Sequence, residues 1–72
     1  MMNIPDICEK LVKARGGKTQ KIAANEIGIS QSALNMYESG TRVPRDEVKE
    51  LIANYYGLTV GYLFFNEKVH EM

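Results

Sequence analysis

The chain has 72 residues with nine basic and nine acidic side chains, so its net charge is zero and its size allows one small domain. Cys8 is the only cysteine, which excludes an internal disulfide as a stabilising device and favours a reducing, cytoplasmic setting. No apolar run approaches the roughly 18 residues of a membrane span, and the N-terminal residues lack the pattern of a secretion signal. We therefore expect a cytoplasmic protein with no membrane segment.

The charges are distributed unevenly along the chain. Residues 10–45 contain seven basic side chains and two acidic ones, Glu26 and Glu38, whereas the flanking residues contain seven acidic side chains and two basic ones. Segregation of this kind indicates a basic surface on one part of the fold, where a polyanion could bind. Ordinary scatter of surface charge explains the same counts, so the charge pattern alone leaves both interpretations open.

The first predicted element is a helix over residues 5–15. Pro5 suits the first helical position, and Asp6 places negative charge in the first turn. Gly16 and Gly17 end the helix. The apolar residues recur every three or four positions and form one stripe, made of Ile4, Ile7, Cys8, Leu11 and Val12.

Two short helices joined by a sharp turn are predicted next. Thr19 is a good N-cap for the second helix, and Ser30 is a good N-cap for the third. Gly28 supplies the left-handed residue that ends the second helix and turns the chain, and Gly40 ends the third helix in the same way. The expected buried positions of the second helix, two of them small enough to let another helix come close, are Ala23, Ala24 and Ile27.

Two further helices complete an all-α pattern of five, and no strand is predicted. The fourth helix begins near Asp46 and ends at Gly57, and Thr59 caps the fifth. In the fourth helix, the apolar positions expected to face the core are Val48, Leu51, Ile52 and Tyr55. In the fifth helix they are Val60, Leu63 and Phe64. We expect one domain over residues 1–66 and a polar C-terminal tail over residues 67–72.

The third helix has two unlike faces when its residues are placed about 100° apart on a wheel. One side, which can dock the helix, carries Ala33, Leu34 and Tyr37. The opposite side carries Gln31, Ser32, Asn35, Met36 and Ser39. Amides and hydroxyls on a short exposed helix can bind base edges in a DNA major groove, and an apolar tip such as Met36 can contact a thymine methyl group. From the residues alone, simple solvation of these polar side chains remains an alternative.

The segment TQKIAANEIGISQSALNMYESGTRVP, residues 19–44, resembles the Xre-type (Cro/cI-like, lambda-repressor-like) helix-turn-helix family. The shared features are Thr-Gln at the start of the second helix, a small residue at Ala24, a Gly-apolar-Ser turn and Glu-x-Gly at the end of the third helix. A basic residue and a proline in the following loop match Arg42 and Pro44. The later stretch ANYYGLTVGYLF resembles the fourth and fifth helices of the family. The resemblance implies a compact five-helix lambda-repressor-like DNA-binding domain with the helix-turn-helix at the second and third helices.

The resemblance also implies roles for particular side chains. Those that match base-contacting positions are Gln31, Ser32, Asn35 and Met36. Those expected to contact phosphates are Gln20, Lys21, Ser39, Thr41 and Arg42. Glu38 matches a glutamate that forms an internal ion pair with the first helix, and Lys13 is the expected partner. The apolar residues expected at a dimer interface are Tyr62, Phe65 and Val69.

These features predict a sequence-specific regulator of transcription that binds double-stranded DNA as a homodimer. A small Cro-like repressor of phage or mobile-element type, without a second domain for a ligand, is the expected form. The alternative is a protein-interaction or antitoxin-like module that retains the fold. The discriminating observation is salt-dependent binding to DNA, which only the regulator should show.

An enzyme is not expected. Residues 17–19 resemble the end of a phosphate-binding loop, but Val12 stands where the first glycine of that motif belongs. The serines have no base positioned with them, and Cys8 and His70 are too few to hold zinc. We therefore expect no cofactor, no metal and no small-molecule ligand.

Overall fold

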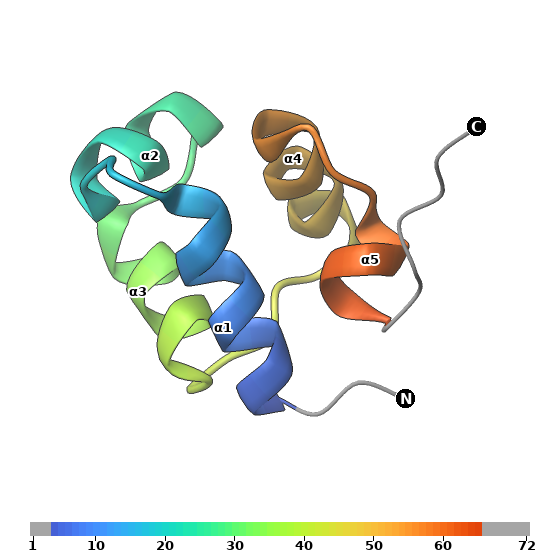
Figure 1. Cartoon of the computed structure of the whole chain (residues 1–72). Helices are drawn as coiled ribbons and strands as arrows, with labels where there is room; N and C mark the ends of the chain where they lie inside the picture. The colour runs from blue at the N-terminus through green and yellow to red at the C-terminus, as the bar shows by residue number, and fades with distance from the viewer. Residues whose placement is uncertain (1–3, 66–72) are drawn as a thin grey trace.

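The computed structural model describes residues 4–65, which form five α-helices and, within that range, no strand (Figure 1). The helices are α1 (Ile4–Arg15), α2 (Gln20–Ile27), α3 (Gln31–Ser39), α4 (Asp46–Tyr56) and α5 (Val60–Phe64). The predicted all-α fold and the order of its five helices are confirmed. The predicted tail, residues 67–72, lies outside the described residues.

The helices form two groups on either side of α1. Figure 1 shows α2 and α3 on one side of α1, and α4 and α5 on the other. Helix α1 packs against both α3 and α5, while α2 packs against both α3 and α4. Helix α1 therefore supports α3, and α4 supports α2, on their core-facing sides. The outer faces of α2 and α3, the two helices of the helix-turn-helix, point away from the core.

The core consists of two groups of buried side chains. The larger contains Leu11, Ile52 and Leu63, each fully buried, together with neighbours from α1, α2, α4 and α5. Complete burial of a leucine or isoleucine side chain contributes about 1.5–3 kcal/mol, so a domain this small depends on each of these residues. The smaller group consists of Ala23 and Ala24 of α2 against Leu34 of α3. The predicted close approach of α2 and α3 over small residues is confirmed.

Two apolar side chains predicted to face the core are exposed instead. Val12 is 45% exposed and Leu51 is 48% exposed. Each lies about 100° around its helix from a fully buried neighbour, Leu11 or Ile52, at the edge of the apolar stripe. A five-helix domain has too few elements to cover the whole width of such stripes, so their edges remain in solvent. The side chain of Ile4, also placed in the α1 stripe, is not described, although its backbone forms the first residue of α1.

The predicted caps and turns of the helix-turn-helix are present. The Thr19 hydroxyl accepts a hydrogen bond from the Ile22 N–H at 3.1 Å, and the Ser30 hydroxyl accepts one from the Ala33 N–H at 3.0 Å. Gly28 ends α2 with a φ of 99°. Gly40 and Gly57 end α3 and α4, as predicted. These local features fix the start of α3 relative to α2.

Replacing Gly28 with alanine tests how strongly the turn depends on its left-handed backbone. An added Cβ would have no atom within 4 Å, so the cost comes from the backbone conformation alone. We expect a loss of about 1–2 kcal/mol in the free energy of unfolding, measured by urea denaturation.

Gly17→Ala is the matched control, because an added Cβ there also has no atom within 4 Å and the φ of Gly17 is outside the left-handed region. Its stability should stay the same or rise by up to about 1 kcal/mol, through a smaller entropy of the unfolded chain. Equal losses in the two variants would contradict the role given to Gly28.

Candidate nucleic-acid interface

The outer face of α3 is polar and open to solvent. Gln31, Ser32 and Asn35 are exposed, whereas Leu34 on the opposite face is fully buried against α2. Met36 is half-buried. The structure thus places the four predicted base-contacting side chains along one helix, with three of them exposed and the fourth partly so.

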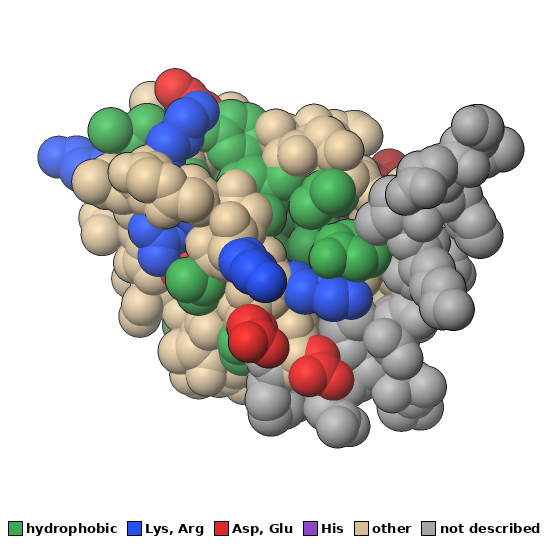
Figure 2. All heavy atoms as spheres, viewed as in Figure 1, with side chains coloured by type: hydrophobic (Ala, Val, Ile, Leu, Met, Phe, Trp, Pro, Cys, Tyr) green, Lys and Arg blue, Asp and Glu red, His purple; other side chains and the backbone are tan. Residues whose placement is uncertain are grey.

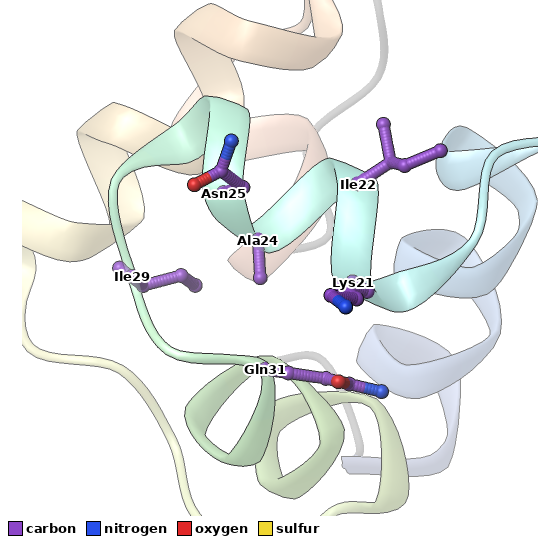
Figure 3. Close-up of a pocket in the computed structure, with 6 residues that line it drawn as sticks. All are labelled: Lys21, Ile22, Ala24, Asn25, Ile29 and Gln31. Carbon is purple, nitrogen blue, oxygen red and sulfur yellow. The ribbon is translucent and has the colours of Figure 1, made fainter.

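Two hollows border this face. A polar hollow of about 430 Å³ is lined by Gln20, Gln31, Ser32 and Asn35. A second hollow, of about 570 Å³, lies between α2 and α3. Figure 3 shows Ala24 and Ile29 pointing into this second gap and Gln31 extending along its edge, with Lys21 nearby. Gln31 borders both hollows, so it lies between the polar face of α3 and the exposed side of α2.

A nearly buried carboxylate, Glu38, lies at the C-terminal end of α3 and is only 8% exposed. Both of its oxygens accept hydrogen bonds from Arg15: Nε is 2.8 Å from Oε2, and Nη2 is 3.0 Å from Oε1. Arg15 also donates through Nη1 to the Lys18 carbonyl oxygen at 2.8 Å. The hydrogen bonds to Glu38 raise the pKa of Arg15 above its ordinary value. The pair ties the end of α1 to the end of α3.

The prediction of Lys13 as the partner of Glu38 was wrong. Lys13 is exposed, and Arg15, in the last turn of α1, makes the ion pair. A planar guanidinium binds both carboxylate oxygens at once and is more weakly hydrated than an ammonium, so arginine is better suited to a nearly buried carboxylate. That preference was the available signal in the sequence for choosing Arg15.

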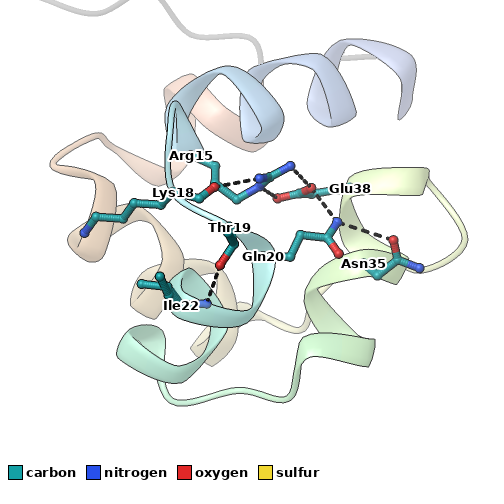
Figure 4. Close-up of polar contacts among 7 residues, drawn as sticks. All are labelled: Arg15, Lys18, Thr19, Gln20, Ile22, Asn35 and Glu38. Carbon is teal, nitrogen blue, oxygen red and sulfur yellow. Dashed lines mark hydrogen bonds and ion pairs between the residues drawn. The ribbon is translucent and has the colours of Figure 1, made fainter.

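Gln20 has an internal role that the sequence did not indicate. Its side-chain nitrogen donates to Glu38 Oε1 at 2.8 Å and lies 3.3 Å from Asn35 Oδ1 (Figure 4). Both amide hydrogens are thereby directed toward protein oxygens. Its backbone N–H stands at the first position of α2, where an N–H has no partner within the helix. A phosphate contact by Gln20 therefore stays a prediction and is best made by this backbone group.

Three predicted phosphate-contacting residues lie at the C-terminal end of α3 and in the hydrogen-bonded turn that follows it. The Ser39 hydroxyl donates to the Met36 carbonyl oxygen at 3.2 Å and lies 2.9 Å from the Thr41 hydroxyl oxygen. The backbone N–H groups of Thr41 and Arg42 donate to that same carbonyl at 2.9 and 3.2 Å. These bonds hold the exposed Arg42 side chain beside the end of α3.

The two acids of the basic segment are both paired. Glu38 is bound by Arg15, and Glu26 lies 3.0 Å from Lys18 Nζ. Glu26 also accepts a hydrogen bond from the Tyr55 hydroxyl, which lowers its pKa below the ordinary value, and Lys18 lowers it further. Both acids of the segment are thus neutralised, while four further basic side chains are exposed: Lys13, Lys21, Arg42 and Arg45.

The predicted dimer residues that the structure describes lie at the C-terminal end of the fold. Phe65 is 52% exposed, whereas Tyr62 is half-buried beneath Lys10, whose Nζ is 3.9 Å from the ring centroid. Figure 2 shows apolar side chains at the surface where α1 meets the α4–α5 end, with lysine or arginine side chains beside them. Val69 lies outside the described residues, so the structure places two of the three residues predicted for a dimer interface, and the interface itself stays a prediction.

A comparison with protein-family models matches residues 9–63 to a helix-turn-helix family. The chain belongs to this family, whose Xre-type (Cro/cI-like) members have a lambda-repressor-like all-α fold and bind DNA as regulators. Searches of curated proteins and of solved structures gave no match. Within residues 4–65, every helix is too short or too polar to cross a lipid bilayer.

Removing Arg15 tests the ion pair directly. Arg15→Ala leaves a nearly buried carboxylate without its cation, so we expect a loss of about 3 kcal/mol in the free energy of unfolding. Lys13→Ala is the matched control in the same helix, and a surface change of that kind should stay within about 0.5 kcal/mol. Urea denaturation of both variants measures the difference, and a larger loss from Lys13→Ala would contradict the assignment of the pair.

Proposed function

We propose that this protein is a sequence-specific transcriptional regulator that binds double-stranded DNA as a homodimer, with α3 in the major groove. The observation that carries the proposal is the exposure of Gln31, Ser32 and Asn35 on a helix anchored through the fully buried Leu34. Amide side chains in this position can make paired hydrogen bonds with base edges, which is how helices of this kind read sequence. Met36 adds a partly exposed apolar group for contact with a thymine methyl group.

Phosphate binding is assigned to the groups at either end of this face. Lys21 lies in the first turn of α2, beside the helix N-terminus, where oriented N–H groups favour an anion. At the other end of α3, Ser39 is the last helical residue, and Thr41 and Arg42 lie in the hydrogen-bonded turn that follows it. These contacts set the position of α3 on the duplex and supply attraction that is independent of sequence.

A single domain of this size reads only a few base pairs, so two copies on half-sites about 10 base pairs apart are proposed. Phe65, Tyr62 and Val69 are the proposed dimer contacts, with the exposed Phe65 ring as the centre. A small Cro-like repressor in the cytoplasm, of phage or mobile-element type, is the proposed biological form. The zero net charge favours one alternative, an antitoxin-like interaction module that has kept the fold.

Binding to random-sequence duplex DNA as a function of salt separates these two functions. A groove-binding dimer releases counterions from the phosphates, so the plot of log binding constant against log salt should have a slope of about −3 or steeper. Fluorescence anisotropy with a labelled duplex provides the measurement. If the protein is instead an interaction module, it should show no binding to the duplex at any salt concentration.

Single substitutions separate base contacts from phosphate contacts. Gln31→Ala and Ser32→Ala should each reduce the preference for the selected sequence over random DNA by about 1–3 kcal/mol. Arg42→Ala should weaken binding to all sequences alike. Competition binding with specific and random duplexes gives both quantities, and an equal loss of preference in all three variants would contradict the roles assigned.

The dimer contact is tested by placing a charge at Phe65. Phe65→Glu should raise the dimer dissociation constant measured by analytical ultracentrifugation, because a carboxylate in an apolar interface must be desolvated. Val43→Glu is the matched control, since Val43 is 51% exposed but lies in the loop between α3 and α4. Dimerisation that persists unchanged in Phe65→Glu, or is lost equally in both variants, would contradict the assigned interface.

A further inference from the structure

Four side chains form a continuous hydrogen-bonded network from the C-terminal end of α1 to the exposed face of α3 (Figure 4). Arg15 binds both oxygens of Glu38, at 2.8 and 3.0 Å. Gln20 Nε2 donates to Glu38 Oε1 at 2.8 Å and reaches Asn35 Oδ1 at 3.3 Å. The network therefore connects a nearly buried ion pair to a side chain on the face that we assign to DNA.

The Arg15–Glu38 ion pair fixes the orientation of the side-chain amides of Gln20 and Asn35. A guanidinium has only donors and a carboxylate has only acceptors, so Glu38 must accept from every neighbour. The Gln20 atom that faces Glu38 is therefore its nitrogen, because an amide oxygen there would be repelled. That same nitrogen faces Asn35, so the Asn35 atom on this side is its oxygen. Each orientation follows from the charge of Arg15 and Glu38.

We propose that this network makes Asn35 a hydrogen-bond donor toward DNA. The base that Asn35 contacts is then guanine or thymine rather than adenine or cytosine. The proposal rests on the proposed function. Figure 4 shows the Asn35 nitrogen on the side away from Gln20, with the oxygen facing the network. Gln20 is thus a positioning residue: it holds the Asn35 oxygen and leaves the Asn35 N–H groups as the outward partners.

The base preference follows from the edges in the major groove. An asparagine that is free to turn can bind adenine through both amide atoms, accepting from N6 and donating to N7. Because its oxygen is turned toward Gln20 and its nitrogen away from it, Asn35 does not present an acceptor outward to the amino group of adenine or of cytosine. Guanine O6 and N7 and thymine O4 are acceptors, and these match an outward donor; adenine N7 also accepts, but the amino group beside it on the same base is then left without an acceptor.

The orientation can be tested in the protein without DNA. Side-chain amide hydrogens that are held in hydrogen bonds exchange with water more slowly than exposed ones. By NMR, the Gln20 side-chain hydrogens should therefore exchange more slowly than those of Asn25, an exposed amide of the same helix. The Asn35 side-chain hydrogens should exchange as fast as those of Asn25. Slow exchange at Asn35 together with fast exchange at Gln20 would overturn the proposed orientation.

The base preference is tested by selecting bound sequences from a random duplex pool. The position whose preference disappears in Asn35→Ala identifies the base that Asn35 contacts. At that position the unmodified protein should favour guanine or thymine by roughly fivefold or more over adenine and cytosine. Gln20→Met, which keeps the side-chain length but removes the amide, should shift the preference toward adenine. Asn35→Asp, which still accepts from Gln20 but presents an outward acceptor, should favour adenine or cytosine.

The outcomes distinguish this inference from the function on which it rests. Asn54→Met, an amide replacement at an exposed position of α4, is the control and should keep the unmodified preference. Selection of adenine by the unmodified protein, an unchanged preference in Gln20→Met, or no change in Asn35→Ala would overturn the inference and leave the proposed function in place. If the unmodified protein enriches no sequence at all, both fail.

Discussion

The rest of the site depends on the ion pair and the hydrogen bonds made by the nearly buried carboxylate of Glu38. Taking an ionised carboxylate out of water is costly unless it is paired and hydrogen-bonded. Arg15 and Gln20 meet this requirement from α1 and α2, so satisfying one charge joins three helices at one point. The placement of α3 and the orientation of Asn35 both follow from it. A single residue thus links the stability of a small core to the chemistry of its surface.

The sequence predicted the features that depend on local chemistry. The caps at Thr19 and Ser30 and the turn at Gly28 follow from residue type alone, and each is present. The features that it missed depend on how the helices pack. The choice of Arg15 over Lys13 is set by which side chain of α1 reaches the end of α3. The internal role of Gln20 has the same origin, because it exists only once three helices have met.

Exposure of apolar side chains was the other point that the sequence could not settle. Val12 and Leu51 lie at the edges of apolar stripes, and only the number of neighbouring helices decides whether an edge is covered. The candidate base-contacting residues were easier to predict, since the wheel of α3 separates Leu34 from the amides. Their exposure agrees with that separation, while their contacts with DNA depend on a partner outside the chain.

The central claim is that the amides of α3 enter the major groove, and NMR of the complex with a selected duplex tests it most directly. The account predicts nuclear Overhauser contacts between the side-chain amide hydrogens of Gln31 and Asn35 and base hydrogens of the major groove. Contacts that come instead from another face of the domain, with Gln31 and Asn35 still in solvent, would contradict it.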